Sequence, residues 1–102
     1  MQKLERVLMK WLEIIELRTV NSDRELLESH LQELIQQVDK ETQMQTIKTY
    51  RRVMLDTDLS FHLFHDSPNV ERNGSPLGLR LASSLKEFGL VNHSVWTEMS
   101  VK

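Results

Sequence analysis

The sequence of 102 residues contains no cysteine, and this absence excludes several kinds of chemistry. A chain without thiols forms no disulfide, has no thiolate nucleophile and offers no thiolate ligand to a metal. It also fits a reducing compartment, so a cytoplasmic location is expected. No apolar run approaches the length of a membrane span, and the charged start MQKLERVLMK lacks the apolar segment of a secretion signal.

An excess of basic charge is also missing. The chain has 13 Lys and Arg residues against 15 Asp and Glu residues, a formal net charge of -2. Because a broad basic surface is what attracts proteins to nucleic-acid phosphates, no nucleic-acid partner is expected, and no membrane partner either. The hydrophobic fraction of 39% and the charged fraction of 27% are those of a folded domain. We expect one domain over residues 10–102, preceded by a short lead-in at residues 1–9.

Glycine and proline are scarce, with three and two residues, and all five lie between positions 68 and 89. There they mark a helix over residues 76–88. Ser75 is placed to cap its first turn, Pro76 suits the first helical position, and Gly89 is expected to end the helix in a left-handed conformation. The apolar face of this helix should contain Gly78, Leu81, Ala82, Leu85 and Phe88. Two small residues on that face predict a close approach to a sheet.

The spacing of apolar residues predicts the other elements. A helix should begin at a capping box formed by Ser22 and Glu25 and continue to about Lys40. Its expected apolar stripe is Leu26, Leu27, His30, Leu31, Leu34, Ile35 and Val38. Strands are predicted over residues 11–20, 46–54, 59–65 and 93–99. A turn is expected at residues 55–58 and an irregular loop at residues 66–74.

The resulting order, strand–helix–strand–strand–helix–strand, predicts an α+β fold of the ferredoxin-like class. In this fold a four-stranded antiparallel sheet carries two helices on one face, and the first and third strands are central. Those two strands are the most apolar in this chain. The other face of the sheet would be bare and partly apolar in a monomer, so we expect a homodimer in which two sheets stack.

The strand WLEIIELRTV and the final segment GLVNHSVWTEM, in this element order, resemble the dimeric α/β-barrel superfamily. Within it they resemble small bacterial proteins of the antibiotic-biosynthesis-monooxygenase-like type, over about residues 10–99. This resemblance implies a homodimeric barrel, with cofactor-independent oxygenase activity in some members. Haem-degrading members carry a His on the second helix and an Asn in the first strand. Neither residue occurs at those places here, so no cofactor is expected.

Glu13 and Glu16 stand in a nearly apolar strand, and one of them should be buried. The buried one would either pair with Arg51 or Arg52 or have a raised pKa. With His62 nearby it would form the best acid–base pair that the sequence offers, so Glu13 and His62 are the catalytic candidates. The alternative interpretation of such a carboxylate is a salt bridge between strands or subunits.

Aromatic residues on the strands are candidates for binding a ligand. Trp96, Tyr50 and Phe64 would line a cavity for an aromatic or lipophilic molecule, and Arg51 beside Tyr50 suits an anion. Core or interface packing is the alternative for the aromatic residues, and solvated edge charges for the arginine.

The four histidines do not predict a metal site. His62 and His65 point to opposite faces of one strand, so no metal site is expected from them. His30 should be packed within the first helix, and His93 should make local hydrogen bonds.

Two functions remain open at this point. The first is a homodimeric barrel that binds a small molecule or acts as a cofactor-independent monooxygenase. The alternative is a non-catalytic regulatory or protein-interaction module. An amino-acid-sensing module would favour glycine between the first strand and helix, where residues 19–23 have none. An RNA-binding sheet would need aromatic residues on one face, whereas Phe61 and Phe64 face opposite ways.

Overall fold

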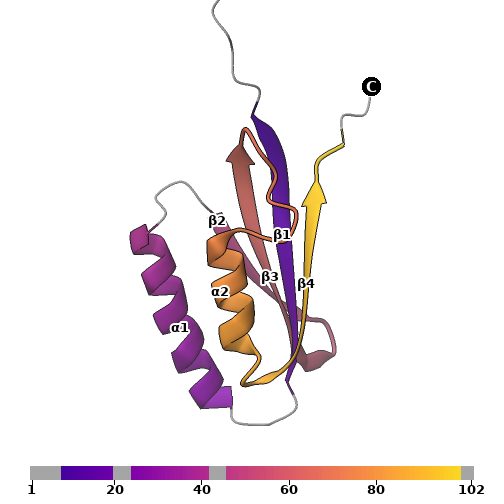
Figure 1. The fold of residues 1–102 in the computed structure, drawn as a ribbon. Helices are drawn as coiled ribbons and strands as arrows, with labels where there is room; N and C mark the ends of the chain where they lie inside the picture. The colour runs from indigo at the N-terminus through magenta and orange to yellow at the C-terminus, as the bar shows by residue number, and fades with distance from the viewer. Residues whose placement is uncertain (1–7, 20–23, 42–45, 100–102) are drawn as a thin grey trace, which may run out of the picture.

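The protein is an α+β structure of six elements, seen in a computed structural model that describes residues 8–19, 24–41 and 46–99. The elements are β1 (Met9–Thr19), α1 (Arg24–Glu41), β2 (Thr46–Arg52), β3 (Leu55–Ser67), α2 (Pro76–Leu85) and β4 (Gly89–Thr97). The sheet has the strand order β2-β3-β1-β4, and all neighbours are antiparallel (Figure 1). The ferredoxin-like fold and the central places of the first and third strands are therefore confirmed.

Both helices lie on one face of the sheet (Figure 1), and the core lies between the helices and the sheet. Alternation along β1 turns four side chains to the helix side of the sheet, so that Trp11, Ile15 and Leu17 are buried together with the acidic Glu13. Phe61 and Leu63 of β3 join them from the neighbouring strand. The other face of the sheet, which we call the open face, carries no helix among the described residues.

Helix α1 buries a narrower stripe than expected. Leu27 and Leu31 belong to the core, and Leu34 packs against it, but Leu26 is exposed. Its position one residue before Leu27 turns it away from the stripe, because neighbouring helix residues point about 100° apart. The predicted cap at Ser22, the side chains of Ile35 and Val38, and the lead-in at residues 1–7 lie outside the described part of the structure.

The hairpin between β2 and β3 turns earlier than predicted. The turn is formed by Val53 and Met54, and Met54 has a φ of 70°, whereas a turn was expected at residues 55–58. Those residues already belong to β3, and Asp58 lies opposite Arg18 of β1. The aspartates that indicated a turn are therefore overridden by pairing between strands.

The end of α2 also differs from the prediction. The helix ends at Leu85 instead of Phe88, and Gly89 is the first residue of β4. Gly89 does not take the left-handed conformation expected of it. A Cβ at this position would lie 2.0 Å from the carbonyl oxygen of Arg18, so the glycine permits close approach to β1.

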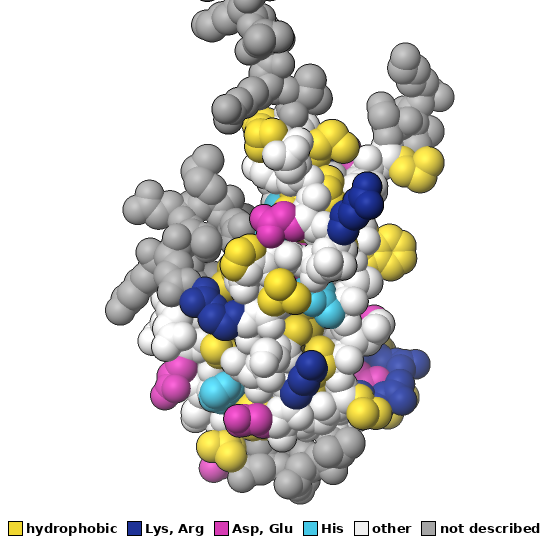
Figure 2. Space-filling model, in the orientation of Figure 1, with side chains coloured by type: hydrophobic (Ala, Val, Ile, Leu, Met, Phe, Trp, Pro, Cys, Tyr) yellow, Lys and Arg dark blue, Asp and Glu magenta, His cyan; other side chains and the backbone are white. Residues whose placement is uncertain are grey.

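Over the described residues, the surface on the helix side mixes positive and negative charge. Side chains of both signs are interspersed with hydrophobic ones over this face (Figure 2). Among the described helices, none is both long and apolar enough to cross a membrane.

Candidate functional site

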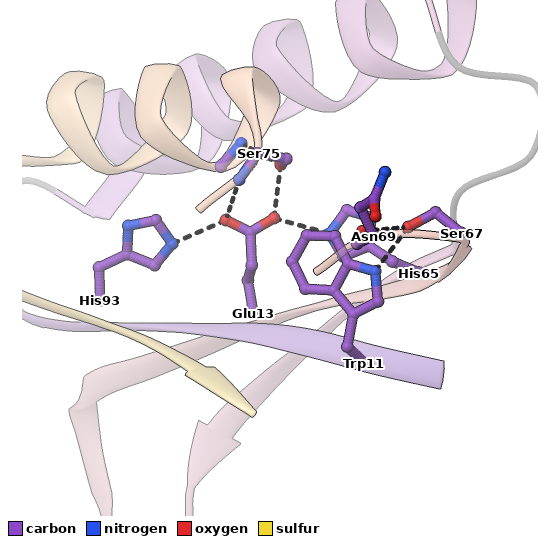
Figure 3. A network of polar contacts seen from close by, with 8 residues as sticks. Trp11, Glu13, His65, Ser67, Asn69, Ser75 and His93 are labelled. Carbon is purple, nitrogen blue, oxygen red and sulfur yellow. Dashed lines mark hydrogen bonds and ion pairs between the residues drawn. The ribbon is translucent and has the colours of Figure 1, made fainter. Parts of the chain in front are cut away.

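The most unusual feature of the core is a charged residue at its centre. Glu13 of β1 is fully buried, with 0% of its surface exposed. The segment between β3 and α2 passes over β1 (Figure 1) and places Ser75, the residue before α2, directly above the carboxylate (Figure 3). Strand alternation thus aims Glu13 at the N-terminus of a helix.

Four donors from three other parts of the chain surround the carboxylate (Figure 3). His65 of β3 lies 2.6 Å from Oε2 through its Nε2, and His93 of β4 lies 2.8 Å from Oε1 through its own Nε2. The backbone N–H of Ser75 donates to Oε1 over 3.0 Å, and its hydroxyl donates to Oε2 over 2.5 Å. Because an ionised carboxylate only accepts hydrogen bonds, each histidine carries its hydrogen on Nε2 in this state. We call Glu13, His65, His93 and Ser75 the Glu13 cluster.

The start of α2 is built to receive this negative charge. Ser75 caps the helix by accepting a hydrogen bond from the N–H of Gly78 at 3.0 Å. The partial positive charge of a helix N-terminus stabilises an anion placed beside it. Two glycines leave room for the carboxylate. A Cβ at Gly78 would lie 1.9 Å from Oε1 of Glu13, and a Cβ at Gly74 would lie 2.7 Å from it. Gly74 also has a φ of 106°.

Hydrogen bonding decides the charge of Glu13. Burial by itself raises the pKa of this carboxyl, but the hydrogen bonds from His65, Ser75 and His93 outweigh burial and lower the pKa below its ordinary value of 4.5. The prediction that a buried Glu13 has either a raised pKa or a partner in Arg51 or Arg52 was therefore wrong. Arg51 instead lies 3.9 Å from Glu28 of α1, and Arg52 lies 3.1 Å from Asp58.

Trp11 holds one side of the Glu13 cluster in place. Its ring stacks on His65 with centroids 4.0 Å apart and planes 19° apart. Its indole N–H donates to Ser67 over 2.8 Å, and the Ser67 hydroxyl donates to the carbonyl of Asn69 over 2.8 Å (Figure 3). The stack fixes the imidazole plane, and the two hydrogen bonds tie the following loop to β1.

The Glu13 cluster is arranged to hold the fold, and it is poorly arranged for catalysis. A general base must reach a proton on its substrate, and Glu13 is inaccessible with both oxygens already hydrogen-bonded. The Ser75 hydroxyl is also buried and already donates to Glu13, so it is as inaccessible to a substrate as the carboxylate. Within the described ranges, no three His, Asp or Glu side chains are grouped to hold a metal.

His62 is not the partner of Glu13, contrary to the prediction. It lies on the open face, opposite Ile14, where its Nε2 is 2.9 Å from the Ser60 hydroxyl and its ring is 4.7 Å from that of Tyr50. The expectation of local hydrogen bonds for His93 was also wrong, since its partner Glu13 is 80 residues away. The sequence did contain a signal for His65. Alternate residues of a strand share a face, and this places His65 on the same face as the apolar Phe61 and Leu63.

The open face gathers the remaining candidates in two halves. Leu12 lies opposite both Phe64 and Trp96, and Ile14 follows two residues along β1. We call these four residues the apolar half. Toward the β2–β3 hairpin the same face carries a groove of about 540 Å³. The groove is lined by parts of Glu16, Leu17, Arg18, Tyr50, Arg51, Arg52, Asp58, Leu59, Ser60, Leu90, Val91 and Asn92.

The structure thus separates the predicted residues into distinct places. Tyr50 and Arg51 line the groove, whereas Phe64 and Trp96 lie in the apolar half. A second hollow of about 450 Å³ lies at the other end of the sheet and includes Trp11 and His65 in its wall. The His65 side chain is only 3% exposed there, so little of its ring is open to this hollow. Comparison of the chain with protein-family models, curated proteins and solved structures gives no match.

Proposed function

We propose that the protein is a homodimeric α/β barrel that stacks two open faces and binds a small aromatic or lipophilic molecule between them. The observation that carries this proposal is the uncovered apolar half. Trp96 is 55% exposed and Phe64 is 38% exposed, beside Leu12 and Ile14 on the same face. Contiguous apolar surface of this kind marks interfaces and binding sites in soluble domains.

The size of the open face suits a second copy. Four strands about 4.8 Å apart, each about 9 residues long at roughly 3.4 Å per residue, cover roughly 600 Å². Two such faces bury roughly 1,200 Å² in total, which is the lower end of the range for specific interfaces. A dimer therefore needs nearly the whole face, and stacking would close the groove from above. The groove volume falls within the usual range for ligand pockets, about 300–1,000 Å³.

Binding has more support than oxygenase chemistry. The groove is not lined by Glu13, and His62 on the open face hydrogen-bonds Ser60 and not a carboxylate. We also propose kinship with the antibiotic-biosynthesis-monooxygenase-like proteins, which rests on the element order and the bare sheet face. Both oxygens of Glu13 are already hydrogen-bonded within the protein. A non-catalytic regulatory or protein-interaction module is therefore the second candidate.

Native mass spectrometry tests the assembly. The expected result for the wild-type protein at micromolar concentration is twice the chain mass, with added mass where a ligand is retained. Phe64→Asp should give monomers, because it places a charge within the stacked faces. Leu79→Asp is the matched control, since Leu79 is 49% exposed on α2, on the opposite side of the sheet. A wild-type monomer, or a Phe64→Asp dimer, would overturn the stacked-sheet proposal.

A dimer alone does not separate the two candidate functions. A retained small molecule, released by denaturation and identified by its mass, supports ligand binding. A clean dimer that binds no small probe supports the interaction module.

A further inference from the structure

We propose that the groove takes an amphipathic anion, an aromatic ring system bearing a carboxylate or sulfonate group, and that Arg18 and Arg52 bind the anionic group. This inference rests on the proposal that the open face binds a small molecule, and it names the class of that ligand.

The two arginines form a cationic clamp around one acid. Nε of Arg18 lies 3.7 Å from Oδ1 of Asp58, and a terminal nitrogen of Arg52 donates to Oδ2 over 3.1 Å. The Asp58 side chain is 17% exposed, while those of Arg18 and Arg52 are 66% and 58% exposed. Each guanidinium has five N–H donors. In these contacts Arg52 donates one of them to Asp58, and Arg18 approaches Asp58 only as an ion pair. Asp58 therefore positions both groups and leaves most of their donors for an incoming anion.

An apolar platform lies beside the clamp. Leu90 of β4 lies opposite Arg18, and Tyr50 of β2 lies opposite Ser60, two residues along β3 from Asp58. Tyr50 is 46% exposed and Leu90 is 67% exposed, so both present apolar surface to the groove. Aromatic faces and guanidinium planes stack favourably on an aromatic ligand. An apolar body with an anionic end matches this arrangement better than a neutral or purely ionic ligand.

The other charged groups of the groove sharpen the inference. Arg51 is already paired with Glu28 of α1 at 3.9 Å. Glu16 faces the groove two residues from Arg18 on β1, and Asn92 donates to its carboxylate over 3.3 Å. Glu16 repels a bound anion, so its removal should strengthen binding. Removal of the clamp and removal of Glu16 should therefore shift anion affinity in opposite directions.

Two fluorescent dyes test this class of ligand. 1-Anilinonaphthalene-8-sulfonate carries an anionic group, and N-phenyl-1-naphthylamine has the same aromatic body without it. In Arg18→Gln/Arg52→Gln, the sulfonate dye should bind about tenfold more weakly, the effect of losing charge-assisted hydrogen bonds of about 1.4 kcal/mol. The neutral dye should bind that variant within about twofold of wild type, because its apolar contacts remain. Glu16→Gln should tighten the sulfonate dye alone.

Controls keep the outcomes distinct. Arg72→Gln removes an exposed arginine of the loop before α2 and should change neither affinity. Circular dichroism establishes that each variant is folded, and native mass spectrometry of the same samples gives the oligomeric state. Unchanged sulfonate binding in the double variant overturns the clamp while leaving ligand binding intact. A wild-type dimer that binds neither dye overturns both the ligand class and the small-molecule function, and leaves only the dimer.

Discussion

Replacing Glu13 by Gln tests whether the buried carboxylate stabilises the fold as its contacts indicate. The substitution keeps the shape and removes the charge. The backbone N–H of Ser75 cannot accept a hydrogen bond, so the glutamine oxygen must take the place of Oε1. The amide NH₂ then faces His65 and the Ser75 hydroxyl, both of which donate to Oε2 in the wild type.

The expected loss follows from these contacts. Hydrogen bonds to a charged group contribute about 1.5–3 kcal/mol each, and neutral ones about 1 kcal/mol. A change of tautomer at His65 and rotation of the Ser75 hydroxyl recover part of the two lost bonds. We therefore expect the free energy of unfolding to fall by about 2–4 kcal/mol. For a domain of this size the midpoint of thermal unfolding should fall by roughly 10–25 °C.

The dependence on pH provides a sharper test of the same idea. The pKa of Glu13 is lowered in the folded protein, so the unfolded chain binds the proton more tightly and stability rises with pH. The contribution of the ionised group is complete above its ordinary value of 4.5 and disappears as the pH falls through the lower folded-state value. The difference in stability between wild type and Glu13→Gln should therefore shrink below pH 4.5.

Urea unfolding followed by tryptophan fluorescence measures the free energy of unfolding and its dependence on pH, because Trp11 stacks directly on His65. Glu16→Gln is the matched control on the same strand; its side chain is exposed, and its effect should stay within about 0.5 kcal/mol. Two results would refute the reasoning: a Glu13→Gln variant as stable as this control, or a stability difference that persists unchanged at pH 3.

Two further substitutions test the backbone around the Glu13 cluster and the hairpin. Gly78→Ala should destabilise by about 3 kcal/mol, because its Cβ would lie 1.9 Å from Oε1 of Glu13. Alanine elsewhere in a helix is favourable, so the control Ser83→Ala on the exposed side of α2 should be neutral or slightly stabilising in thermal unfolding. If Gly78→Ala and Ser83→Ala changed stability equally, the close contact at Gly78 would be contradicted. Met54→Gly should raise the free energy of unfolding by about 0.5–1 kcal/mol in urea titrations, since relief of a left-handed conformation exceeds the added chain entropy. The neighbouring control Val53→Gly should lower the free energy of unfolding. If Val53→Gly were instead the more stable of the two variants, Met54 would be shown to be unstrained.

The sequence predicted the fold well because its local signals agree with the final packing. Ser75 and Pro76 mark the start of α2, and the parity of β1 separates Trp11, Glu13 and Ile15 from the open face. The end of α2 and the hairpin turn were misplaced because pairing with β1 overrides local preferences, as at Gly89 and Asp58.

The Glu13 cluster could be predicted only in part. A buried acid in β1 was expected, but its partners come from positions 52, 62 and 80 residues away. Which histidines meet it depends on the register of three strands, and no local pattern states that register. Parity alone favoured His65 over His62, because only His65 shares its face with Phe61 and Leu63.

The Glu13 cluster also favours the correct register of the strands. A slip of β1 by one residue would turn Glu13 to the open face and place apolar Ile14 or Leu12 against Ser75 and the two histidines. A slip by two residues would keep the face but leave the carboxylate among core side chains without its donors. Each misalignment buries polar groups without partners, which is costly. A single acid in an apolar strand thus makes one register of the sheet much more stable than its near alternatives.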